Sequence, residues 1–188
     1  MPVDPDADRR SVRKRCASGS DTGFTAIEML IAVGIVSVVV ALAVPGLVRA
    51  RRTASEVGAI GSLRVTAAAQ KAYASTCGHG GYARSFTVLG STGPEGAPAF
   101  ISDDLGRAAM PVKAGYRYTL EASAVSHAGP DDCASQPTVT AYYATASPTS
   151  VGWTGSRSFA VGSGSVIWEL PGGSAPPEPF SPPAAPVN

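Results

Sequence analysis

The chain has 188 residues, a formal net charge of +1 and 15% charged residues. This length allows one domain with a modest core plus an appendage. Because the net charge is small, no long-range field favours nucleic acid or an acidic surface, and we expect no nucleic-acid partner.

A long apolar segment at residues 24–48 follows the charged segment 1–23, and Glu28 is its one charged residue. As a helix, 25 residues would extend about 37 Å, more than the roughly 30 Å hydrocarbon layer of a bilayer. Five basic residues precede the segment and three follow it, which weakly favours a cytoplasmic N-terminus. Three interpretations remain: a secretory signal cut after Ala41-Leu42-Ala43, a single-span anchor, or a precursor cut after Gly23.

Glu28 distinguishes these interpretations. A carboxylate within a membrane span costs about 2.5–3.5 kcal/mol on insertion scales, and neither a signal peptide nor a simple anchor needs one. The apolar segment contains no Lys, Arg or His that could pair with it. Cleavage after Gly23 would give Phe24 a free α-amine one helical turn away. We therefore predict that this amine pairs with Glu28 of its own chain or of a neighbouring chain.

The run GFTAIE at 23–28, followed by the apolar segment, resembles the prepilin signal of type IV pilins and type II secretion pseudopilins. The resemblance implies that a prepilin peptidase cuts between Gly23 and Phe24 and methylates the new amine of Phe24. It also implies that Glu28 recruits the subunit into a growing filament. Two departures from the family pattern are Asp21-Thr22 in place of a basic residue before Gly23, and Ala26 in place of the more usual Leu.

The fold that the resemblance implies is α+β and type IV pilin-like, with a long N-terminal membrane helix packed on a small antiparallel β-sheet. The implied function is structural and not enzymatic: a type IV pilus subunit, assembled by helical bundle packing after leader cleavage. Implied partners are further copies, other pilins, the prepilin peptidase and an inner-membrane assembly platform. The precursor would lie in the bacterial inner membrane, and the mature subunit in an extracellular pilus. Alternatives are a type II secretion pseudopilin in a periplasmic pseudopilus, or a minor pilin for adhesion or DNA uptake.

The helix has two weak points, Gly34 and Pro45, and the pilin resemblance implies that this stretch kinks, or loosens in the filament so that the fibre can extend. A simple kink without a mechanical role is the alternative. Residues 49–76 form a predicted amphipathic continuation, with Ile60, Leu63, Ala67 and Ala74 on one face. The run TASE at 53–56 fits a capping box, so the helix either restarts there or carries a polar patch. We expect it to end near Ser75, before Gly78.

Residues 77–170 are predicted to form an antiparallel sheet head. Aromatic side chains Phe86, Trp153, Phe159 and Trp168 are expected in the core or half-buried in the sheet, with an aromatic surface for partner contact as the alternative. The last segment, 171–188, contains seven prolines in eighteen residues, so we expect an extended, largely disordered tail or a strap along the domain. The predicted strands are Tyr116–Val125, Thr138–Ala146, Arg157–Val161 and Val166–Leu170, with a hairpin at Gly162–Ser165 and a short strand at Arg84–Leu89.

Cys77 and Cys133 are the two cysteines beyond the leader. Outside the cytoplasm such a pair predicts a disulfide, with two buried free thiols as the alternative. No residues suggest catalysis, a cofactor or a metal site. His79 and His127 lie in no ligand pattern, and we interpret Asp103-Asp104 and Asp131-Asp132 as solvated loop charges.

Overall fold

The computed structural model describes residues 23–91, 96 and 98–187. The predicted leader therefore lies outside the described residues, except for Gly23. These residues fall into two units, one ending at Leu42 and one beginning at Ala43.

One helix, α1 (Ala26–Thr76), contains 51 residues and includes Pro45. Proline has no N–H, so the carbonyl of Ala41 lacks its usual backbone partner, and the predicted kink stays a prediction. The helix ends where the N–H groups of Cys77 and Gly78 both donate to the carbonyl of Tyr73, at 2.9 and 2.7 Å. The predicted end, near Ser75 and before Gly78, is confirmed.

The predicted restart of the helix at Thr53 is wrong, because α1 runs through this position without interruption. Thr53 does not act as an N-cap: its hydroxyl donates to the carbonyl of Arg49 at 3.2 Å, one turn earlier in the same helix. The polar-patch alternative also fails for Glu56, which is buried. Its carboxylate bonds the sheet.

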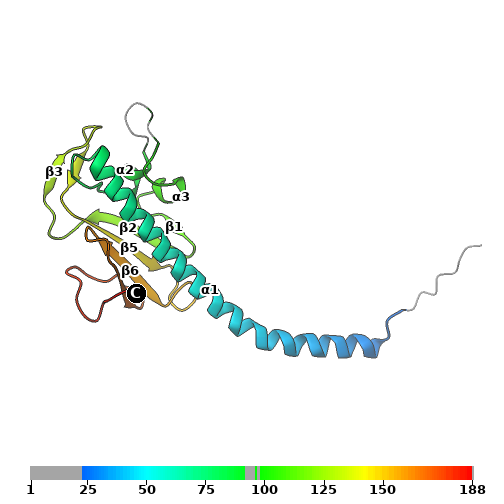
Figure 1. The fold of residues 1–188 in the computed structure, drawn as a ribbon. Helices are drawn as coiled ribbons and strands as arrows, with labels where there is room; N and C mark the ends of the chain where they lie inside the picture. The colour runs from blue at the N-terminus through cyan, green and yellow to red at the C-terminus, as the bar shows by residue number, and fades with distance from the viewer. Residues whose placement is uncertain (1–22, 92–95, 97, 188) are drawn as a thin grey trace, which may run out of the picture. The chain divides into compact units, whose positions relative to one another are not determined.

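In the second unit, an antiparallel sheet packs against the C-terminal part of α1 (Figure 1). This confirms the predicted α+β fold, in which a long N-terminal apolar helix packs on an antiparallel sheet. A separate two-stranded ribbon and two short helices, α2 and α3, complete this unit. The six sheet strands, in spatial order, are β1 (Val112–Lys113), β2 (Tyr116–Ala122), β5 (Tyr142–Pro148), β6 (Arg157–Gly162), β7 (Ile167–Pro171) and β8 (Ala185–Pro186). The ribbon is β3 (Ala128–Asp131) with β4 (Pro137–Val139); the helices are α2 (Phe86–Gly90) and α3 (Asp103–Gly106).

The core lies between α1 and one face of the sheet. Along β2, buried residues alternate with more exposed ones, as expected for a strand with one covered face. The buried residues of α1 recur at three- and four-residue spacing, as expected for one helix face. They are Glu56, Ala59, Ser62, Leu63, Thr66, Ala67, Ala69, Gln70 and Tyr73. Their sheet partners in the core cluster are Tyr116, Tyr118, Leu120, Tyr142, Ala144, Ala146, Phe159, Val161 and Ile167.

Two strand predictions are wrong. The run Thr138–Ala146 is split between two sheets: the Thr140 N–H donates to the carbonyl of His127 at 3.0 Å, and the chain turns before β5 begins. Arg84–Leu89 contains the start of α2 because Ser85 caps a helix there, accepting the Val88 N–H at 3.3 Å. The hairpin at Gly162–Ser165 is confirmed, with a 2.9 Å hydrogen bond from Ser165 N–H to the Gly162 carbonyl.

The tail is a strap on the sheet, so the prediction of a largely disordered tail is wrong for its described residues and the alternative is confirmed. Phe180 stacks on Trp168 with ring centroids 5.4 Å apart and planes 9° apart. The Tyr143 hydroxyl donates to the Pro176 carbonyl at 2.6 Å, and β8 pairs with β7. Trp168 and Tyr143 alternate with core residues, so the strap covers the sheet face opposite α1. Proline removes few hydrogen bonds here because it lies at the sheet edge and in loops.

Candidate functional site

The candidate site is the start of α1, where residues 23–25 are exposed and non-helical and the helix begins at Ala26. Thr25 and Glu28 bond each other reciprocally. The Thr25 N–H and hydroxyl both donate to Glu28 Oε2, at 2.8 and 2.7 Å, and the Glu28 N–H donates to Thr25 Oγ1 at 3.3 Å. This is a capping box, which satisfies N–H groups that a helix start otherwise leaves unpaired.

The capping box gives Glu28 a partner that the sequence argument missed. The expected partner is a cation, whereas Thr25 supplies neutral donors. The signal was present in the sequence, because TAIE at 25–28 has the same spacing as TASE at 53–56. The pattern was assigned to the wrong one of two matching sites. Pairing of Glu28 with an amine on Phe24 stays a prediction, since it requires cleavage.

Beyond this cap, the apolar part of α1 leaves its side chains uncovered. No residue from Ala26 to Leu47 is buried, and Leu30 and Leu42 are 73% and 78% exposed. Within the part of the chain that the structure describes, α1 is long and apolar enough to cross a bilayer. Gly34 lies in this part, and the space beside it is open. An apolar surface of this extent requires lipid or protein to cover it.

The other half of α1 is attached to the sheet through a buried carboxylate. Glu56 Oε1 accepts the N–H and hydroxyl of Ser156, both at 2.8 Å, and its Oε2 accepts Arg157 Nε and Nη2 at 3.0 and 2.7 Å. Arg157 Nη1 also donates to Glu169 Oε2 at 2.6 Å. Burial acts to raise the pKa of Glu56, but these hydrogen bonds outweigh it and the pKa is lowered. Glu56 therefore stays ionised and fixes α1 to β6. Sequence reasoning missed this pair because its members are about a hundred residues apart.

A disulfide fixes the C-terminal end of α1. Cys77 and Cys133 form the predicted bond, with Cα atoms 4.8 Å apart, and the Cys133 N–H donates to the Cys77 carbonyl at 2.8 Å. Beside it, the Tyr73 hydroxyl donates to Asp132 Oδ2 at 2.5 Å. Burial acts to raise the pKa of Asp132, but the bonds from Tyr73 and two backbone N–H groups lower it overall. The interpretation of Asp132 as a solvated loop charge is therefore wrong.

The remaining acidic pair, Asp103-Asp104, is at the surface and has basic partners. Arg107 Nη2 lies 2.9 Å from Asp103 Oδ2, and Lys113 Nζ lies 2.6 Å from Asp104 Oδ2. Among the described residues, no group of three or more His, Cys, Asp or Glu side chains is placed to hold a metal ion. The carboxylates of Asp103, Asp104 and Asp132 thus bond to protein groups.

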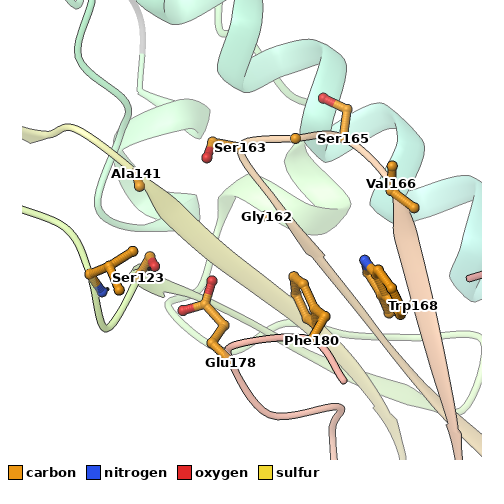
Figure 2. Close-up of a pocket in the computed structure, with 11 residues that line it drawn as sticks. Ser123, Ala141, Gly162, Ser163, Ser165, Val166, Trp168, Glu178 and Phe180 are labelled. Atoms are coloured by element: carbon orange, nitrogen blue, oxygen red, sulfur yellow. Dashed lines mark hydrogen bonds between the residues drawn. The ribbon is translucent and has the colours of Figure 1, made fainter. Parts of the chain in front are cut away.

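A cavity of about 240 Å³ lies between the β6–β7 hairpin and the strap (Figure 2). Figure 2 shows Glu178 and Phe180 of the strap facing the hairpin residue Ser163 and the β7 residue Trp168. Glu178 Oε2 accepts the Ala124 N–H at 3.0 Å. The lining contains serine hydroxyls and the Glu178 carboxylate, but no histidine, lysine or cysteine.

The sequence-predicted residues thus fall into two places. Gly23, Phe24 and Glu28 lie together at the start of α1, whereas Cys77 and Cys133 lie at its other end. Comparison of the chain with protein-family models, curated proteins and solved structures finds no match.

Proposed function

We propose that this chain is the precursor of a type IV pilus subunit. The observation that carries the proposal is the uncovered apolar part of α1, which is continuous with a helix half-buried in a stable head. A membrane holds this part in the precursor, and copies of the same helix cover it in the filament. Packing between the helices then supplies most of the cohesion.

The geometry around Gly23 supports cleavage at the proposed position. Gly23 and Phe24 are exposed and precede the helix, so a peptidase meets accessible backbone and not a helix interior. Cleavage leaves the α-amine on Phe24, directly before the capping box. Glu28, in the first turn of α1, then has a cation close to its carboxylate. In the filament, a neighbouring subunit's amine neutralises it.

The first experiment is mass analysis of the chain recovered from membranes and from sheared filaments. The proposal expects a chain beginning at Phe24 with a methylated amine. A chain beginning at Val44 would show a secretory signal, and an intact chain in normal filaments would show that cleavage is unnecessary. Long filaments on the cell surface would indicate a pilus. A pseudopilus subunit would instead be indicated if deletion of the protein abolished secretion of exported proteins.

The second experiment separates the charge of Glu28 from its capping role. Glu28→Gln keeps a residue that serves in capping boxes but removes the charge, whereas Thr25→Ala removes the cap and keeps the charge. We expect Glu28→Gln to abolish filament assembly while membrane insertion persists, and Thr25→Ala to assemble. Equal assembly by Glu28→Gln and the unmodified chain would refute a recruitment role for the carboxylate.

A further inference from the structure

An exposed tryptophan stands on a hydrogen-bonded turn of the head. Trp153 is 70% exposed, which corrects the prediction that it is buried or half-buried and leaves the alternative of an aromatic surface, and Val151 beside it is 55% exposed. The N–H groups of Trp153 and Thr154 both donate to the Ser150 carbonyl, at 3.1 and 2.9 Å. The Ser150 N–H donates to Thr154 Oγ1 at 3.1 Å. The turn's own hydrogen bonds therefore hold the indole outward.

This turn lies beside the point where the apolar run of α1 ends. Trp153 and Thr154 line a cleft of about 370 Å³ together with Val48 and Arg51 of α1. Val48 is the last residue of the apolar run, and Arg51 belongs to the basic cluster directly after it. The remaining lining residues are Ser55, Ala114 and Gly115, so the cleft has no acidic group.

The depth of this cleft in a bilayer follows from the apolar run, because Val48 and Arg51 lie at its end and directly after it. If residues 24–48 span the hydrocarbon layer, Val48 lies at its boundary and Arg51 lies among the headgroups, since a helix rises about 1.5 Å per residue. Tryptophan is enriched at this depth because its ring is apolar and its N–H is polar. Arginine there keeps its charge in the headgroup layer while its stem covers apolar surface.

We propose that Trp153 and Arg51 form a membrane-interface anchor, in which the cleft takes the headgroup of an anionic phospholipid and the indole enters the acyl boundary. The inference rests on the proposed membrane-inserted precursor and goes beyond it, because it gives the head its own lipid contact. Before assembly, this contact holds the head against the bilayer surface.

Charge complementarity selects anionic lipid as the occupant. Arg49, Arg51 and Arg52 lie close together, and the sequence has no acidic residue between Glu28 and Glu56. Glu56 is bonded to Arg157 and Ser156, so its charge is compensated within the head. Each arginine near an anionic membrane surface is worth roughly a fivefold factor in affinity.

Val125 provides an internal comparison because it is also an exposed apolar side chain, at 75%. The cleft contains Gly115, just before β2, whereas Val125 follows the other end of that strand. Seven residues of strand separate these ends by about 20 Å. Position 125 is therefore an exposed position remote from the cleft.

The test uses the full chain carrying Trp168→Phe, so that Trp153 is its one tryptophan. It is reconstituted at one copy per nanodisc, in phosphatidylcholine with and without phosphatidylglycerol, and insertion is checked separately by carbonate extraction from vesicles. Lipids brominated near the headgroup end of the acyl chain quench an interfacial indole, and aqueous iodide quenches an exposed one. The matched control combines Val125→Trp with Trp153→Phe and Trp168→Phe.

We expect brominated lipid to quench Trp153 and iodide to quench position 125. Arg51→Gln should reduce the preference of Trp153 for phosphatidylglycerol about fivefold. An inserted chain whose Trp153 is as open to iodide as position 125 overturns the anchor and leaves the proposed function intact. If Trp153 is shielded from iodide in filaments but not in single-copy nanodiscs, the anchor is also overturned. The exposed surface at Trp153 would then be a contact with a neighbouring subunit. A chain that fails to insert contradicts the proposed function itself.

Discussion

The two parts of α1 are one helix in two different environments. Before Val48, no described helical residue is buried, and the sequence is a run of Val, Ile, Leu and Ala. After Ser55, buried residues recur on one face, with the charged Glu56 among them, whereas Arg64 and Lys71 are exposed. Among the described residues, the first part therefore has no partner that covers it, and the second has one.

Helix propensity does not explain this difference. The N-terminal part is rich in β-branched residues, which are mediocre helix formers in water. A bilayer removes that disadvantage because backbone groups in lipid must bond internally. The C-terminal part instead derives its stability from the rest of the head: Glu56 bonds it to the sheet, and Tyr73 and the disulfide bond it to the turn between β3 and β4. Substitutions in the head should therefore change its unfolding without changing membrane insertion.

The largest expected effect comes from the disulfide. Cys77→Ser, or reduction of the unmodified chain, opens a link with a sequence separation of 56 and should lower the free energy of unfolding by up to about 4 kcal/mol. Urea unfolding followed by circular dichroism in detergent measures the loss. Carbonate extraction should show unchanged insertion. Identical urea midpoints for oxidised and reduced protein would contradict this assignment.

Glu56→Gln should have the next largest effect, about 2 kcal/mol, because it replaces hydrogen bonds between charged groups by weaker ones. Glu169→Gln is the matched control, since its carboxylate also bonds Arg157 but is more exposed. The folded pKa of Glu56 lies below its ordinary value of 4.5. The stabilisation it provides is thus present above that value and is lost as the pH falls through the folded pKa. In Glu56→Gln, the free energy of unfolding should fall less steeply as the pH is lowered than it does in the unmodified chain. An unchanged fall would exclude Glu56 as its source.

Sequence patterns predicted the parts of the fold that local chemistry determines. The apolar run, the end of α1, the β6–β7 hairpin and the cysteine pair follow from composition, glycine position and cysteine count. Two identical S/T-x-x-E patterns show the limit. The one at Thr25 caps a helix because the described residues before Ala26, 23–25, are not helical, whereas at Thr53 the chain is already helical and Glu56 bonds the sheet. Only tertiary context distinguishes them.

For a related reason, the sequence did not decide between a disordered tail and a strap. Proline content indicated a chain without a core of its own, but Phe180 gains its stability from Trp168 and Tyr143, which precede it in the chain. Trp153 differs in the opposite direction: we expect it in the core or half-buried, and it is exposed, as in the alternative of an aromatic surface. Both outcomes depend on contacts between distant segments.

Phe180→Ala should release the strap at a cost of about 1.5 kcal/mol, from lost stacking and apolar burial. The expected result is faster removal of the C-terminal segment by a nonspecific protease, with the disulfide-linked head intact by mass spectrometry. Ser181→Ala, at the next and exposed position, should leave the cleavage rate unchanged. Equal rates for both variants would mean that the ring stack does not hold the strap.

The smallest effect is expected at the other end of the molecule. Thr25→Ala removes the hydroxyl that both donates to Glu28 and accepts its N–H, and loss of such a cap costs about 1 kcal/mol. Because the cap acts on the first turn alone, hydrogen exchange should accelerate at the first residues of α1, while the N–H groups around Leu63, packed in the core, exchange as before. Thr25→Ser keeps the hydroxyl and should restore protection. If Thr25→Ala changed exchange around Leu63 as well, the two parts of α1 would form a single cooperative unit, and the division between them by environment would not extend to their stability.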